Sequence, residues 1–293
     1  MTMTPGPTSP PDQPPPRRRR SAEASAKAEG GHYVHILSGA IVLTAALSSA
    51  AYGQNAVAGR IPDPSESASP RPAPRLADGR PDLGNGKGSW NPRVLANLAG
   101  LGDPSRSPVE KRVDVPFQPW AKAVYEERQA NLQKHDPESR CLPPGIPRMM
   151  ATPFPFQIFQ LSDRVLFVFE GGAHVWRTIY TDGRAHQKDP NPSFLGDSVG
   201  HWEGDTLVAD VIGFNESTWL DQAGHPHTDA LHVIERFTRK NERTLHYEVT
   251  IDDPKAYTRP WTTSYVIPWA PGVELFEYIC QENNRDLPHM VGR

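Results

Sequence analysis

The side chains best suited to chemistry lie in residues 213–230, a segment without strand periodicity. At its centre stands His225-Pro226-His227, where the proline favours an extended backbone with both imidazoles on one side. Two such imidazoles can hold a divalent metal ion together with a carboxylate such as Asp221, or they can act as acid and base. The alternative is that both histidines hydrogen-bond loop carbonyls and only shape the loop.

The length of this segment also indicates function, because long loops inside compact domains are commonly functional or disordered. Its aromatic side chains and its proline favour an ordered loop. We predict that Asn215 and Trp219 contact a ligand there.

Acidic side chains on apolar strand faces are a second indication of chemistry. Alternation places Glu277 on one face with Leu275 and Ile279. Glu170 continues the face of Leu166 and Val168 in the same way. We predict Glu277 and Glu170 as catalytic carboxylates, because burial raises the pKa of a carboxyl toward values suited to proton transfer. Structural ion pairs at strand ends or on the outer face are the alternative.

The same parity places Glu235 and Asp210 among apolar neighbours. A carboxylate that faces the interior of a sheet needs a cation or a hydrogen-bond donor beside it. Arg177 is a candidate for that cation, and we also predict it as a ligand contact.

His174, Trp176 and Tyr180 share one face of a predicted strand. Their mixture of aromatic, imidazole and hydroxyl groups suits a small-molecule pocket, so we predict all three as ligand contacts. A solvated outer face with cross-strand aromatic pairs is the alternative.

Short strands must position these side chains, because period-two runs of aromatic and β-branched residues follow one another after residue 156. The predicted strands are 157–161, 165–169, 174–180, 198–202, 206–212, 231–238, 244–252, 261–267 and 273–280. Before them, residues 119–134 predict one helix that begins near Pro119. The fold class is therefore mainly β: an antiparallel meander that closes into a lipocalin-like barrel able to hold one small ligand, with a β-sandwich as the alternative.

The first part of the chain has a different composition. Residues 1–53 join a leader with arginines at 17–20 to an apolar stretch at 36–47, a pattern that predicts a signal peptide cleaved before Gln54. Residues 54–80 are rich in proline and poor in large apolar residues, which predicts a disordered spacer. A single β domain, 81–293, would then be periplasmic or secreted, with no stable membrane span after cleavage; an uncleaved anchor is the alternative.

The cysteines and the net charge limit the functions that the chain can have. The chain has two cysteines, Cys141 and Cys280, and in an oxidising compartment such a pair is expected to form a disulfide rather than a thiol nucleophile. The net charge of −3 and the lack of a basic face in the β domain predict no nucleic-acid partner. The common hydrolase, zincin, kinase and dehydrogenase motifs do not occur.

Several short sequence motifs follow one another over about residues 81–293. In this order they resemble the motifs of a large group of exported bacterial β-domain proteins of unassigned function. They are Pro81-Asp82-Leu83, Pro116-Phe117-Gln118-Pro119-Trp120, Arg140-Cys141-Leu142-Pro143, Trp202-Glu203-Gly204-Asp205-Thr206-Leu207-Val208, Gly224-His225-Pro226-His227-Thr228 and Ile251-Asp252-Asp253-Pro254. The resemblance implies export and a compact β domain, and it carries no activity. The run between Leu83 and Trp90 is longer than the Leu-x-Gly-x-Trp opening typical of lipocalins.

From these observations we expect an exported enzyme, a lyase or a hydrolase, that acts on a small organic molecule in a barrel pocket, with or without a divalent metal ion. One alternative is a lipocalin-like carrier that holds a small hydrophobic ligand without changing it. The other is an envelope protein whose aromatic loop docks to a partner.

Overall fold

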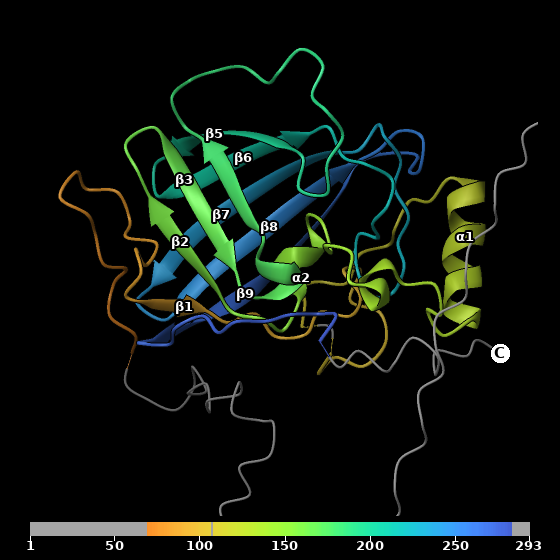
Figure 1. Ribbon diagram of the computed structural model, residues 1–293, viewed down its shortest axis with the longest axis horizontal. Coiled ribbons are helices and arrows are strands. Elements are labelled where there is room, and N and C mark those ends of the chain that lie inside the picture. Colours follow the sequence, from red (N-terminus) through yellow and green to blue (C-terminus); the bar gives the residue numbers. More distant parts are fainter. Residues whose placement is uncertain (1–68, 107, 283–293) are drawn as a thin grey trace, which may run out of the picture. The chain divides into compact units, whose positions relative to one another are not determined.

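Nine strands form one sheet that closes in a ring in the computed structural model, which describes residues 69–106 and 108–282 (Figure 1). In chain order they are β1 (Gly88–Trp90), β2 (Phe156–Gln160), β3 (Arg164–Phe169), β4 (Trp176–Tyr180), β5 (Asp197–Glu203), β6 (Thr206–Ile212), β7 (His232–Asn241), β8 (Thr244–Asp252) and β9 (Trp261–Pro271). The predicted leader and signal peptide, and residues 54–68 of the predicted spacer, lie outside the described residues.

Strict alternation along the strands decides which side chains fill the ring. On β8 every second residue is buried, and the set is Leu245, Tyr247, Val249 and Ile251. On the neighbouring strand, Phe237 pairs with Tyr247 and Val233 pairs with Ile251, so both interior faces match.

The sheet departs from a uniform antiparallel meander at one position. β4 and β5 pair in parallel, through Tyr180 and Val199. A parallel neighbour requires a long connection, because the chain must return to the same end of the sheet. Residues 181–196 supply that connection, and in Figure 1 the chain leaves the sheet between β4 and β5 as a long loop.

The short strand β1 closes the ring and was not predicted. It pairs with β2 through Trp90 and Phe156, and with β9 through Gly88 and Pro271. A Cβ atom at Gly88 would lie 2.5 Å from the carbonyl oxygen of Ala270, so only glycine permits this close approach of two backbones. Because β1 and β8 occupy both edges of β9, the predicted strand 273–280 has no edge to pair with and is irregular.

The helix α1 (Pro119–Ala130) falls within the predicted range, with Pro119 in its first turn, and it follows β1 in the chain rather than preceding the whole sheet. The remaining helices are short: η1 (Pro137–Arg140), η2 (Arg148–Ala151) and α2 (Gly171–His174). The predicted strand 174–180 therefore begins two residues late, because His174 ends α2. None of the described helices is both long enough and apolar enough to span a lipid bilayer.

Two sets of contacts hold the segments that lie outside the strands. Cys141 and Cys280 form a disulfide, as predicted. Arg75, in the predicted spacer, makes two hydrogen bonds to Asp205 in the loop after β5, of 2.8 and 2.6 Å. Its neighbour Arg71 pairs with Glu242 at 2.6 Å. Residues 69–80 are thus attached to the β domain by ion pairs.

Candidate functional site

A buried carboxylate–imidazole pair lies in the loop between β6 and β7. The Nδ1 atom of His225 is 2.7 Å from an Oδ atom of Asp221, and both side chains are fully buried. The carboxylate also accepts hydrogen bonds from the backbone N–H groups of Leu98, Gly224 and His225. Burial by itself would raise the pKa of Asp221, but the interaction with His225 and these N–H donors lower it overall. Asp221 is therefore an ionised acceptor that holds the Nδ1–H of the imidazole.

The other ring nitrogen of His225 has a different environment. Nε2 is buried and has no hydrogen-bond partner among the described residues. Aromatic rings enclose it: Phe117 stacks on the imidazole at 5.5 Å between centroids and Tyr125 at 4.5 Å, while Trp261 of β9 lies at 5.7 Å. The Nε1–H of Trp261 is likewise buried without a partner in the described part of the chain. The rings of His225 and Trp261 are thus neighbours, and one carries an unpaired acceptor (Nε2) while the other carries an unpaired donor (Nε1–H).

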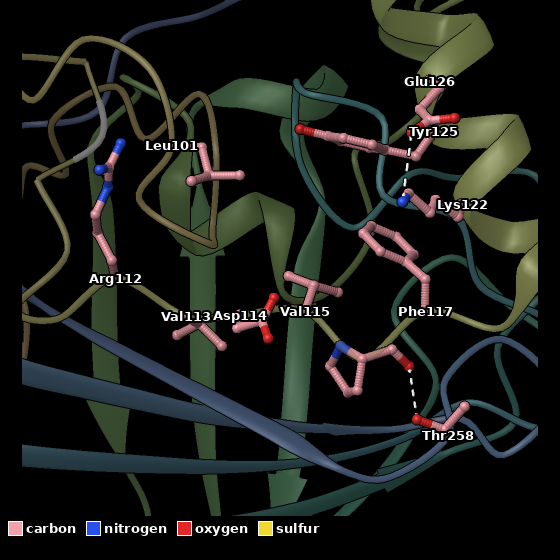
Figure 2. Close-up of a pocket in the computed structure, with 11 residues that line it drawn as sticks. Leu101, Arg112, Val113, Asp114, Val115, Phe117, Lys122, Tyr125, Glu126 and Thr258 are labelled. Atoms are coloured by element: carbon pink, nitrogen blue, oxygen red, sulfur yellow. Dashed lines mark hydrogen bonds and ion pairs between the residues drawn. The ribbon is translucent and has the colours of Figure 1, made fainter.

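A cavity of about 730 Å³ adjoins this aromatic enclosure. Phe117 and Tyr125 line it, and in Figure 2 they lie close together, while Arg112 lies at the opposite end. Apolar walls come from Leu101, Val113, Val115 and Pro116, and charged lining residues are Arg112, Asp114, Lys122 and Glu126. His225 does not itself line the cavity; it lies behind the two aromatic side chains that do.

His227 does not join His225 in a shared site. Its Nδ1 donates to the carbonyl oxygen of Thr228 at 3.1 Å, and its Nε2 lies 2.8 Å from the hydroxyl of Thr218. Burial lowers the pKa of His227, which keeps the ring neutral. Both ring nitrogens of His227 have hydrogen-bond partners. In this arrangement the imidazole has no free lone pair for a metal ion. Among the described residues no group of three or more His, Cys, Asp and Glu side chains is arranged to hold a metal.

A second polar cluster lies inside the ring. Arg177 of β4 pairs with Glu235 of β7, and the side chains are 1% and 0% exposed. Ser198 accepts a hydrogen bond from Arg177 Nε at 3.0 Å, and the Tyr247 hydroxyl donates to Glu235 at 2.8 Å. The sequence had singled out both Arg177 and Glu235, and the structure pairs them across the interior.

The two carboxylates predicted to be catalytic do not face that interior. Glu277 is exposed, because the segment that carries it is not a strand. Glu170 is buried, but it accepts a hydrogen bond from the backbone N–H of Phe276 at 2.7 Å, outside the ring. The inward face of β3 is Val165, Phe167 and Phe169, opposite to the face from which Glu170 was extrapolated.

The predicted ligand contacts are dispersed. Trp176 is 68% exposed on the outer face, and two arginines cover the ring of Tyr180. Trp219 packs under Arg128, and Asn215 caps a turn by accepting the N–H of Ser217. The side chain of His174 lies outside the described part of the chain. None of these four side chains (Trp176, Tyr180, Trp219 and Asn215) lies with Arg177 in the interior. For Trp176 and Tyr180 on β4, the alternative of an outer face is therefore the correct one.

Asp210 also lies on the outer face, where it meets two histidines. His186, from the long β4–β5 connection, places its ring nitrogens 2.8 Å from Asp197 and 3.0 Å from Asp210. His232 lies 2.8 Å from the same oxygen of Asp210. Burial opposes protonation of His186, but the two carboxylates outweigh it and raise its pKa.

Sequence reasoning missed the residues that complete both clusters. Phe117 and Tyr125 come from segments far from His225 in the chain, so no local pattern could have associated them. On β9 a signal was present, since parity alone places Trp261, Thr263 and Tyr265 on one face. Comparison of the chain with protein-family models, with curated proteins and with solved structures found no match.

Proposed function

We propose that this protein is an exported hydrolase in which His225, oriented by Asp221, acts as a general base on a small organic ester held in the adjoining cavity. The observation that carries the proposal is the buried imidazole with one nitrogen bound to a carboxylate and the other unpaired. The same arrangement orients the base of serine hydrolases, where the carboxylate fixes the tautomer and stabilises the imidazolium that forms.

The nucleophile in this proposal is water. No serine or cysteine among the described residues hydrogen-bonds the imidazole of His225. Thiol catalysis needs a free cysteine, and both cysteines of the chain are in the disulfide. A water molecule between the two rings would accept a hydrogen bond from Trp261 Nε1–H and donate one to His225 Nε2. His225 takes the proton as the water oxygen bonds to the carbonyl carbon. The ester C–O bond then breaks, and the leaving alkoxide takes the proton back from the imidazolium.

Access requires a movement of one aromatic side chain. Phe117 and Tyr125 separate His225 from the cavity, and rotation of either ring about its χ angles would bring the cavity to Nε2. When that ring returns, the two rings exclude bulk water, which strengthens the electrostatic interactions of the reacting groups. The apolar walls favour an acyl or alkyl chain, and the charged lining residues favour a polar end on the same molecule.

The experiment is hydrolysis of p-nitrophenyl esters of increasing acyl length by the mature protein. Removal of a general base typically lowers the rate by about 10²–10⁴-fold, and we expect such a loss in kcat/KM for His225→Gln. His227→Gln is the matched control, because it alters the neighbouring buried imidazole, and it should retain most of the activity wherever it folds. Wild-type rates no higher than buffer across the series, or equal rates for His225→Gln and wild type, would rule out this mechanism.

A carrier function has one observation in its favour, the apolar wall of the cavity formed by Leu101, Val113, Val115 and Pro116. A carrier would bind the amphiphilic probe 1-anilinonaphthalene-8-sulfonate, with Val115→Asp weakening binding and His225→Gln leaving it unchanged. No ester would be turned over. Export remains part of both proposals, and the disulfide supports it because such bonds persist in oxidising compartments.

A further inference from the structure

We propose a second binding site inside the ring of strands, between Arg177 and the inner face of β9, for a small uncharged molecule with a carbonyl or hydroxyl oxygen. The site is separate from the Asp221–His225 pair. Its residues come from β4, β7, β8 and β9, and neither the cavity nor the β6–β7 loop contributes to it.

Unpaired buried atoms mark the site. Arg177 Nη1, Thr263 Oγ1 and Tyr265 Oη are all buried and have no hydrogen-bond partner in the described part of the chain. Thr263 and Tyr265 are two residues apart on β9, so both side chains point inward. A buried polar group without a partner costs free energy, and native proteins contain few of them. Three in one interior therefore point to a molecule that satisfies them.

The contacts of Glu235 link the residues that carry these three atoms. Glu235 pairs with Arg177 and accepts a hydrogen bond from Tyr247. Tyr247 lies opposite Tyr265 in the strand register, with ring centroids 5.2 Å apart. Thr263 lies opposite Val249, which itself pairs with Glu235 on the other side. The unpaired hydroxyls of β9 thus flank the ion pair from the strand two places away.

The charges of the cluster select the class of ligand. Arg177 and Glu235 cancel one another, so an anion would meet the Glu235 carboxylate and a cation would meet the Arg177 guanidinium. What remains is an excess of donors, from Arg177 Nη1–H and the hydroxyls of Thr263 and Tyr265. A neutral acceptor oxygen satisfies them without adding charge to a buried site. A closed sheet of about eight strands can hold one small ligand where side chains do not fill its interior, and this ring has nine strands.

The site can be tested with N-methylacetamide, which carries one neutral carbonyl, and with acetate, which has similar size and a negative charge. We expect saturation-transfer NMR of the wild-type protein to show binding of N-methylacetamide and none of acetate. The double variant Thr263→Val and Tyr265→Phe should reduce the N-methylacetamide signal at least tenfold. Thr262→Val, which removes a hydroxyl on the outer face of β9 that is already bonded to Thr250, is the matched control and should keep the signal.

Thermal unfolding separates the outcomes. If the hydroxyls serve a ligand, N-methylacetamide should raise the melting temperature of the wild type more than that of the double variant. Equal NMR signals from wild type and double variant would overturn the proposal, as would binding of acetate alone. The proposal would also be overturned if the double variant melts higher than the wild type and N-methylacetamide shifts neither melting temperature. The buried hydroxyls would then only destabilise the protein, with no ligand to pair with them. His225→Gln should bind the probe normally, which separates this site from the proposed hydrolytic one.

Discussion

The guanidinium of Arg148 makes two parallel hydrogen bonds of 2.7 Å to the two carboxylate oxygens of Asp136. Both side chains are buried, and Arg148 also pairs with Glu138 at 2.6 Å. Asp136 accepts the N–H of Glu138 as well, and so caps η1. One cation thus joins η1 and η2, next to the disulfide at Cys141.

Arg148→Leu should therefore destabilise the fold strongly. The variant leaves two partly or fully buried carboxylates without their cation, and breaking a buried ion pair in this way costs about 3–5 kcal/mol. Denaturant unfolding measures the loss. The triple variant Arg148→Leu, Asp136→Leu, Glu138→Leu should recover much of it, because no charge is then left unpaired; a loss in the single variant below about 1 kcal/mol would contradict the assigned role.

Removal of the disulfide should lower stability by roughly 5 kcal/mol in the chain-entropy model, because the bond closes a long loop of the unfolded chain. Cys141 and Cys280 are 139 residues apart. The change to make is Cys141→Ser with Cys280→Ser, measured by urea unfolding against the oxidised wild type. Reduced wild-type protein should match the double variant, and a difference between the two would show that the serines themselves disturb the fold.

Asp221→Asn should lower both stability and the proposed ester hydrolysis. The asparagine keeps the shape but loses the charge that orients His225, and a hydrogen bond to a charged group contributes about 1.5–3 kcal/mol. Because the folded pKa of Asp221 is lowered, the carboxylate stabilises the fold above its ordinary pKa, and that contribution disappears as the pH falls through the folded value. The gap in unfolding free energy between wild type and variant should accordingly narrow in acid. A gap that widens in acid would contradict the assigned charge state.

Protonated His186 should stabilise the attachment of the 181–196 connection to β5 and β6. The groups that face it are Asp197 and Asp210, and His232 contacts the same oxygen of Asp210. Its folded pKa is raised above 6.5, so the stabilisation is complete below that value and is lost as the pH rises through the folded pKa. His186→Gln should thus destabilise the protein more at about pH 5.5 than at about pH 8.5. His201→Gln, an exposed histidine beside Glu203, is the control, and an equal effect of His186→Gln at both pH values would refute the attachment.

The grouping of side chains into two faces could be predicted from the sequence because alternation is a local property. Wherever a strand has a neighbour on both edges, every second side chain must face inward, and Val233, Glu235 and Phe237 could be assigned from β7 alone. The pairing of the two cysteines could be predicted from their number and from the expectation of an oxidising compartment. The candidate base His225 was also recognisable, since its acidic neighbour Asp221 lies only four residues away.

Other features depended on which segments meet in space. The run 273–280 alternates like a strand, yet β1 and β8 hold both edges of β9, so Glu277 is exposed. Closure of the ring requires a glycine at residue 88 against the backbone of β9, a contact between residues far apart in the chain. The separation of His225 from His227 likewise follows from tertiary contacts, because Phe117 and Tyr125 enclose one ring while Thr218 binds the other. Local periodicity determined which side chains share a face, and only long-range packing decided which face turns inward and what it meets there.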